Sequence, residues 1–176
     1  SSDVCSSDLA PAAWATEPPA EVRAVLPEPR LHGAMRYRWL GLSIYDARLW
    51  RPEASAPLSA EGYAVRDFAL ELIYARRLSG EGIADRSIEE MRRLERLDEA
   101  RAEAWRAAMR AAFPDVQAGE RLVGVNRAGR GARFLHQGRP TGEVAEADFA
   151  RLFFGIWLSP RAPEPALRAA LLGAGG

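Results

Sequence analysis

The side chains in this sequence that could do chemistry are two histidines, one cysteine, and arginines and tyrosines on predicted strands. His32 and His136 lie far apart along the chain, and a metal site needs more ligands than two histidines supply. Packing or solvent exposure explains each histidine more simply than a role as a catalytic base. Cys5 lies among the first nine residues, so the remainder has neither a thiolate nucleophile nor a disulfide framework. We therefore expect no metal and no cofactor.

Common catalytic and nucleotide-binding motifs are absent from the sequence, which has no H-E-x-x-H, G-x-S-x-G, P-loop or G-x-G-x-x-G. The glycine-rich string "GVNRAGRG" lies in a predicted hairpin and not between a strand and a helix. All 24 basic residues are arginines, which are spread along the chain and balance 24 acidic residues. Nucleic acid is therefore not an expected partner. No apolar run approaches a membrane span, and the oligomeric state stays open.

The amino terminus differs from the rest of the chain. "SSDVCSSDL" repeats the triplet SSD, so we interpret residues 1–9 as a scar and not as native sequence. The triplet Ala13-Trp14-Ala15 has the small-x-small pattern of a signal-peptidase site, with cleavage after Ala15. The alternative is an Ala/Pro-rich disordered tail. We divide the chain into a remnant and linker over 1–21 and one domain over 22–176, and we expect a periplasmic or secreted protein.

Alternating side chains predict strands in the first half of the domain. In "RLHGAMRYRWLGLSIYDARLW", Met35, Tyr37 and Trp39 face one way, while Arg36 and Arg38 face the other. Gly41 predicts a bend, after which Ile44, Tyr45 and Leu49 continue as the second strand of a hairpin. In the next strand, one face carries Phe68, Leu70, Leu72 and Tyr74, and the other carries Ala69, Glu71 and Ile73.

Helical spacing follows. Apolar residues recur with a helical period over 79–97, and Ser87 with Glu90 forms a capping-box pattern at which the main helix could start. A second helix is predicted over 98–113, and Pro114 ends it. Three strands separated by glycine-rich turns follow, then a helix with Asp148 as its proposed cap, and a short helix that Gly173 ends. This order favours an α+β fold in which helices pack on one face of an antiparallel sheet.

Several strings occur together in a characteristic order: "GAMRYRWLGLSIYDARLW", "ALELIYARRLSGEGI", "FPDVQAGERLVGV", "RFLHQGRPTGEV" and "DFARLFFGIWLSP" with "ALRAALLG". Together they resemble the bacterial branch of the chalcone isomerase-like family over roughly residues 22–173. The resemblance implies an open-faced β-sandwich, a large antiparallel sheet with a layer of helices. It also places the segment 148–160 beside a cleft. Gly155 would then permit close approach of a ligand, or simply tight packing of the helix on the sheet.

The resemblance implies candidate site residues as well. Plant members of the family cyclise chalcones, and an active-site Arg stabilises the enolate charge that develops. Arg36 best matches that Arg and is the candidate catalytic residue, with Arg38 as its rival. Tyr45 matches a cleft position on the next strand, and Tyr74 on the third strand could offer its hydroxyl into the same cleft, so all four are candidate ligand-binding residues. The alternatives are a surface Arg36 paired with Glu71 or another acid, and tyrosines that only pack in the core.

Three functions follow from these features. The first is a non-catalytic binder of a small apolar or fatty-acid-like ligand in the bacterial envelope, where an Arg would pair with a carboxylate. The second is an isomerase of the chalcone-flavanone type that uses Arg36. The third is an interaction protein, because five tryptophans are available for an interface. We favour the first.

Overall fold

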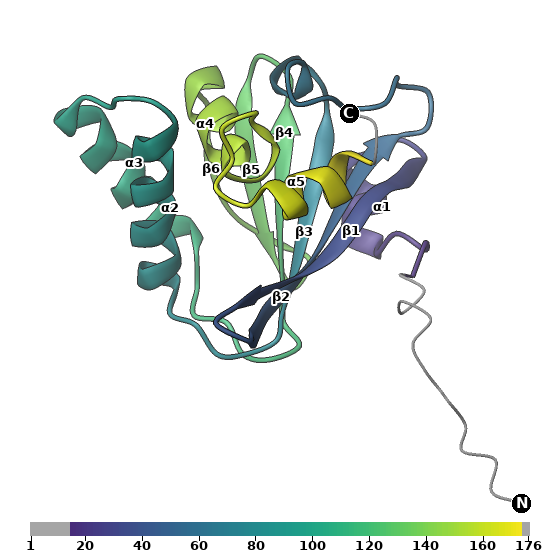
Figure 1. Ribbon diagram of the computed structural model, residues 1–176, viewed down its shortest axis with the longest axis horizontal. Helices are drawn as coiled ribbons and strands as arrows, with labels where there is room; N and C mark the ends of the chain where they lie inside the picture. The colour runs from purple at the N-terminus through teal and green to yellow at the C-terminus, as the bar shows by residue number, and fades with distance from the viewer. Residues whose placement is uncertain (1–14, 174–176) are drawn as a thin grey trace, which may run out of the picture.

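Six antiparallel strands form the centre of the fold. The computed structural model describes residues 15–173. The strands are β1 (Pro29–Trp39), β2 (Leu42–Pro52), β3 (Phe68–Tyr74), β4 (Arg121–Arg127), β5 (Gly131–His136) and β6 (Arg139–Val144). They lie in the sheet in chain order, each paired with its neighbours in sequence (Figure 1). The sheet is therefore an open meander with β1 and β6 at its edges.

A layer of helices covers one face of this sheet (Figure 1). The helices α2 (Gly80–Leu94) and α3 (Glu99–Ala112) connect β3 to β4, and α4 (Ala147–Leu158) and α5 (Pro165–Leu172) follow β6. The predicted α+β class is thus confirmed. The short helix α1 (Ala20–Val25) was not expected, and its Val22 packs on the opposite face against Trp50 and Val123.

Two helix starts differ from the sequence prediction. α2 begins at Gly80, where the Ser79 hydroxyl accepts a hydrogen bond from the Gly82 N–H. Ser87 instead lies inside the helix and donates to the Ile83 carbonyl at 2.8 Å. Asp148 does not cap α4 but lies in its first turn, where a negative charge still favours the helix. A Ser with a Glu three residues later therefore does not distinguish a helix start from a helix interior.

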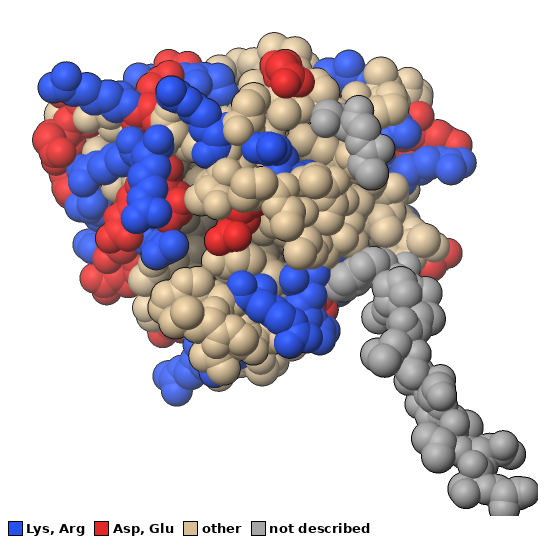
Figure 2. Space-filling view, viewed as in Figure 1, with Lys and Arg blue, Asp and Glu red and all other residues tan. Residues whose placement is uncertain are grey.

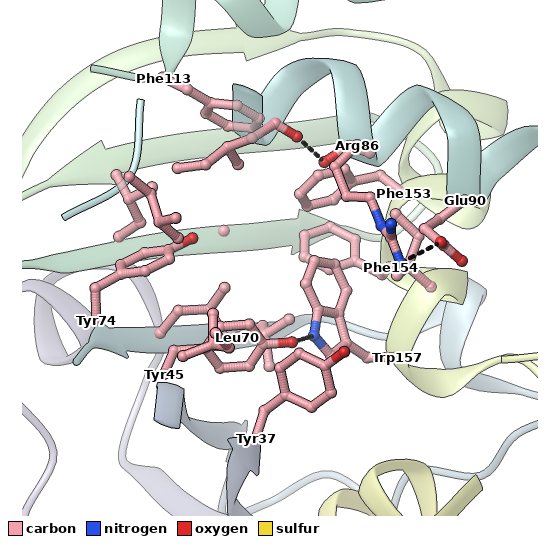
Figure 3. A pocket seen from close by; sticks show the side chains of 18 of the residues that line it. Tyr37, Tyr45, Leu70, Tyr74, Arg86, Glu90, Phe113, Phe153, Phe154 and Trp157 are labelled. Atoms are coloured by element: carbon pink, nitrogen blue, oxygen red, sulfur yellow. Dashed lines mark hydrogen bonds and ion pairs between the residues drawn. The ribbon is translucent and has the colours of Figure 1, made fainter. Parts of the chain in front are cut away.

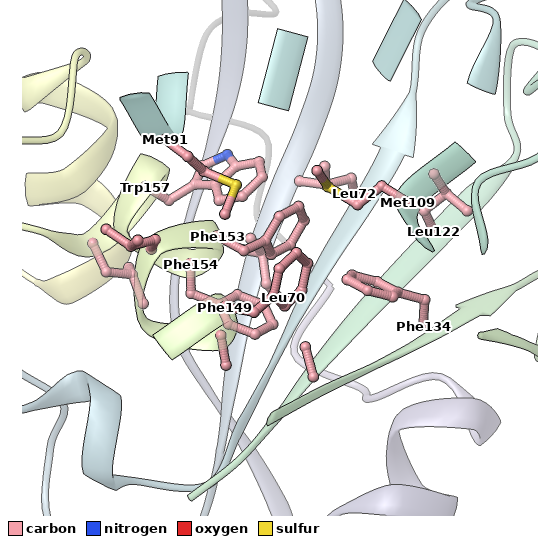
Figure 4. Close-up of a cluster of buried hydrophobic side chains, with 14 of the residues drawn as sticks. Leu70, Leu72, Met91, Met109, Leu122, Phe134, Phe149, Phe153, Phe154 and Trp157 are labelled. Carbon is pink, nitrogen blue, oxygen red and sulfur yellow. The ribbon is translucent and has the colours of Figure 1, made fainter. Parts of the chain in front are cut away.

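The apolar segment 148–158 falls within α4, which lies on the sheet. Phe149, Phe154 and Leu158 are fully buried there, and rings from α4 pack against β5 (Figure 4). A Cβ atom on Gly155 would lie 2.8 Å from the hydroxyl oxygen of Tyr63, which donates to a carbonyl of the same helix at 2.6 Å. Gly155 therefore permits tight packing of α4, which was the second of the two explanations that we gave for this glycine.

A buried ionic cluster lies on the opposite face of the sheet. Glu71 is fully buried and accepts hydrogen bonds from Nε and Nη2 of Arg48 at 2.7 and 2.8 Å, and from Nε1 of Trp50 at 2.8 Å. Arg121 also pairs with Glu71 and extends the cluster to Glu21 of α1 at 3.0 Å. Because these charges are mutually paired, burying them is tolerable. The cluster connects three strands and attaches α1 to the sheet.

His32 joins β1 to two other segments. Its Nδ1 lies 2.7 Å from the carbonyl oxygen of Leu171 in α5, and its Nε2 accepts from the Leu58 N–H at 2.9 Å. A carbonyl can only accept and an amide N–H can only donate, so the ring is neutral with its proton on Nδ1. Gly33 makes this close approach possible, because a Cβ there would lie 2.2 Å from the carbonyl oxygen of Ala170.

This geometry predicts a loss of stability at acidic pH. Burial lowers the pKa of His32 below its ordinary value of 6.5, and the nearby Arg51 lowers it further, against the hydrogen bond to Leu171, which raises it. The unfolded state therefore binds a proton first as the pH falls through 6.5, so the contribution of His32 to stability is complete above that pH and declines below it.

We expect the stability advantage of the wild type over His32→Phe to shrink between neutral pH and about pH 5. Urea denaturation of both proteins at several pH values measures this advantage. An advantage that stays constant over the range would contradict the neutral, doubly hydrogen-bonded ring.

None of the helices in residues 15–173 is long and apolar enough to cross a membrane. The interpretation of residues 1–9 as a scar concerns positions outside the described residues, as do Ala13 and Trp14 of the proposed cleavage pattern.

Candidate ligand-binding cavity

A cavity of about 420 Å³ lies between the sheet and the helix layer (Figure 3). The sheet forms one wall with Leu70, Leu72 and Leu122, and the helices form the other with Ile83, Phe153 and Trp157. This volume falls within the roughly 300–1,000 Å³ typical of small-molecule sites. Because most of the lining is aliphatic or aromatic, the cavity suits a ligand that is largely apolar.

Three tyrosines form a row across the sheet side of the cavity. Tyr37 on β1 lies opposite Tyr45 on β2, and Tyr45 lies opposite Tyr74 on β3. Their ring centroids are 5.1 and 5.9 Å apart. The row follows from strand alternation, since cross-strand partners share one face of a sheet.

The hydroxyl groups of this row supply polar contacts inside the apolar space. The Tyr45 hydroxyl accepts a hydrogen bond from Nε1 of Trp157 at 2.9 Å, and the Tyr74 hydroxyl points into the cavity (Figure 3). Burial raises the pKa of Tyr45 and of Tyr74 well above the ordinary value. Both hydroxyls are therefore neutral at physiological pH and can donate to a ligand oxygen.

A charged pair lies at the end of the cavity away from Tyr74 (Figure 3). Arg86 of α2 approaches Glu90 one turn later, with Nη2 and Oε1 3.0 Å apart. Arg93 shares the same carboxylate at 3.3 Å, although it does not line the cavity. The second oxygen of Glu90, Oε2, is buried and has no hydrogen-bond partner within residues 15–173. This end therefore offers a ligand two kinds of contact, an acceptor in Glu90 and a donor in Arg86.

The open side of the cavity lies between the β1–β2 hairpin and α2. The exposed lining residues are Trp39 on the hairpin, Ser79, Gly82 and Arg86 around α2, and Pro163 and Glu164 before α5. In the space-filling view, a hollow lies beside the charged surface of the helices (Figure 2). Arg86 thus stands at the mouth, where its guanidinium can turn between solvent and ligand.

The structure separates the four sequence-predicted site residues. Tyr45 and Tyr74 line the cavity together, but Arg36 and Arg38 do not. Arg36 is half exposed and forms two hydrogen bonds with its cross-strand neighbour Asp46, from Nε at 2.7 Å and from Nη2 at 3.1 Å. This is the surface pairing that we had weighed as the alternative, with Asp46 in place of Glu71. Alternation along β1 gives the reason, since Tyr37 faces the cavity and its neighbours in sequence must face away.

Sequence reasoning missed Arg86, Glu90 and Trp157 as site residues. Ile83, Ser87 and Glu90 share a helical face, and this could have indicated which side of α2 meets the sheet. We had let the main helix start at Ser87, so Ile83 and Ser87 were not compared as residues of one helical face. Trp157 was identified only as part of an apolar segment, since its hydrogen bond depends on Tyr45, which is 112 positions away.

The fold agrees with comparisons to known proteins. The family model described as chalcone isomerase-like matches residues 20–173, so the chain belongs to the chalcone isomerase-like family. Its structure is similar to that of a fatty-acid binding protein of Arabidopsis thaliana, with a TM-score of 0.61 over 82% of this chain and 87% of that one. The two sequences are 11% identical, so this likeness concerns the fold alone. No curated protein sequence matches the chain.

Proposed function

We propose that this protein binds a fatty-acid-like ligand without catalysis, with the hydrocarbon chain in the cavity and the carboxylate at Arg86. The observation that carries the proposal is a cavity of about 420 Å³ with largely apolar walls and a cation at its mouth. The fatty-acid binding activity named for the Arabidopsis structure supports the same ligand class. This proposal moves the anion contact from Arg36, where the sequence prediction put it, to Arg86.

The pairing of Glu90 permits this role. Arg86 and Arg93 share Oε1 of Glu90, so Arg86 can turn to a ligand while Arg93 continues to neutralise the buried carboxylate. The Arg86 side chain is 59% exposed, so little packing holds it in its present position. A guanidinium is well suited to a carboxylate because it donates two parallel hydrogen bonds.

Saturated fatty acids of increasing length provide the test. We expect affinity to rise by about 0.8 kcal/mol, close to fourfold, for each buried methylene until the cavity is full. We expect Arg86→Gln to weaken fatty-acid binding by about tenfold or more, because a charge-assisted hydrogen bond is lost. Isothermal titration calorimetry with delipidated protein measures both effects.

Arg92→Gln is the matched control, because Arg92 lies on the same helix but pairs with Glu99 and does not line the cavity. It should leave fatty-acid affinity nearly unchanged, and Arg86→Gln should leave the binding of a fatty-acid methyl ester nearly unchanged. The carboxylate assignment fails if both ligand types lose affinity equally in Arg86→Gln. Absence of binding for every chain length would reject the function itself.

The isomerase alternative depends on Arg36, whose guanidinium lies outside the cavity lining and is paired with Asp46. No other observation favours that reaction. We also propose the bacterial envelope as the location, on the basis of the Ala13-Trp14-Ala15 pattern. Cell fractionation of the full-length gene product tests it, and recovery in the cytoplasmic fraction alone would contradict it.

A further inference from the structure

The turn between β1 and β2 presents large apolar side chains to solvent. Trp39 is 52% exposed, Leu40 80% and Leu42 48%, and these three make up most of the exposed large apolar residues within 15–173. We refer to Trp39, Leu40 and Leu42 as the hairpin tip. In the ribbon view the tip projects beyond the body of the sheet (Figure 1). Contiguous apolar side chains in such a position are typical of an interaction surface.

The backbone of the tip makes its composition more unusual. Leu40 and Gly41 both have positive φ values, 50° and 79°. Glycine, asparagine and aspartate are the residues that normally occupy such a two-residue turn. Leu40 adopts this unfavourable conformation while its side chain is almost entirely in solvent, so neither the turn nor the core explains why a leucine stands there.

Positive charge predominates on the two segments next to the tip. The segments 35–46 and 75–78 carry four arginines, Arg36, Arg38, Arg76 and Arg77, and one acid, Asp46, which Arg36 neutralises. The Ala75 N–H donates to the Ile44 carbonyl at 2.9 Å, which holds the second segment beside the hairpin. Arg38, Arg76 and Arg77 form no ion pair with the rest of residues 15–173. Figure 2 shows an uncharged surface at the lower left, with blue arginine side chains beside and below it and red acidic side chains above it.

The tip is continuous with the cavity mouth. Trp39 belongs to the tip and also lines the cavity. Ile44 on the following strand lines the cavity as well. The exposed residues at the start of α2 form the other side of the opening. Whatever covers the tip therefore stands directly at the entrance to the cavity.

We propose that the hairpin tip docks on an anionic lipid bilayer. Trp39, Leu40 and Leu42 enter the headgroup region while Arg38, Arg76 and Arg77 contact acidic headgroups. Apolar side chains combined with basic ones favour such interfacial binding, and tryptophan favours that depth. Docking would place the cavity mouth against the bilayer, so that an apolar ligand exchanges without crossing water. Only this last step depends on the proposed ligand function.

Vesicle sedimentation tests the docking. The wild type should bind vesicles of equal parts phosphatidylglycerol and phosphatidylcholine, and it should bind pure phosphatidylcholine vesicles far more weakly. The double variant Leu40→Ser with Leu42→Ser should reduce the partition coefficient about tenfold or more, because the buried apolar area is lost. The double variant Arg76→Gln with Arg77→Gln should reduce it roughly tenfold at low salt, and the loss should diminish as salt is raised.

Val65→Ser is the matched control, because Val65 is 74% exposed but lies in the short 3-10 helix η1 (Tyr63–Val65), outside the tip and the cavity lining. It should bind vesicles like the wild type. Leu72→Trp, which fills the cavity, should also still bind, so a failure of the ligand proposal is distinguishable from a failure of docking.

Two results would overturn the proposal. One is equal partition of the wild type and the leucine double variant. The other is a concentration-dependent dimer that the leucine variant abolishes, with no vesicle binding by either protein, since the tip would then serve a second copy of the chain.

Discussion

Replacing Glu71 by Gln should lower the free energy of unfolding by about 3–5 kcal/mol, because it leaves charged partners buried without their counter-ion. Arg48 is almost fully buried and directs two of its nitrogens at this carboxylate, and Trp50 donates a third hydrogen bond to it. A neutral amide cannot accept from all of them. Urea denaturation followed by circular dichroism measures the loss, which is a large part of the total stability of a typical domain.

Asp46→Asn is the matched control on the same sheet. It also removes one carboxylate from an arginine pair with two hydrogen bonds, but Arg36 is 50% exposed and solvates readily. We expect a cost of about 1 kcal/mol or less. If both variants lose the same free energy of unfolding, burial of the Glu71 cluster does not raise the cost of removing a counter-ion, and the prediction is wrong. If Glu71→Gln does not fold, Arg48→Met added to it should restore folding by removing the unpaired charge.

Leu72→Trp should weaken fatty-acid binding strongly, because the indole and the ligand compete for one apolar space. We expect the dissociation constant to rise more than about tenfold. Leu72 lies on the sheet wall directly opposite Leu122 of the next strand, and both line the cavity. Unfilled apolar space costs stability, so the variant should fold and gain about 0.5–2 kcal/mol. Calorimetric titration and thermal denaturation measure the two effects.

Val65→Trp controls for the added tryptophan, because that position is exposed and does not belong to the cavity lining. It should bind fatty acids like the wild type. Unchanged affinity in Leu72→Trp would place the ligand elsewhere on the molecule. If Leu72→Trp does not fold, Leu122→Trp replaces it as the test, because Leu122 is the cross-strand neighbour of Leu72 and also lines the cavity. This second variant should fold and lose fatty-acid binding.

Strand alternation made much of the architecture predictable. The alternation of Tyr37 with Arg36 and Arg38 was evident from residue types, as were the two faces of β3. Tyr45 and Tyr74 line the cavity, and their role in holding a ligand stays a prediction. A period of two assigns residues to two faces, and the family resemblance then selected the wrong face for the arginine.

The cation at the cavity mouth could not be predicted in the same way. Arg86 is one of three arginines in α2, and only the packing of this helix on the sheet separates it from the other two. The ionic cluster was equally hidden, because Arg48, Glu71 and Arg121 come from three strands. Such partners depend on register across the sheet, which residue spacing along one strand does not determine.

The two faces of β3 have a consequence for how this protein can diversify. Leu70, Leu72 and Tyr74 shape the cavity, while Glu71 between them anchors the ionic cluster behind the sheet. Substitutions that alter ligand choice therefore need not touch the contacts that hold the strands together. The cavity wall and the ionic cluster can therefore vary separately along one strand, within the limit that Leu70, Leu72 and Tyr74 are buried and a large change in their volume costs stability.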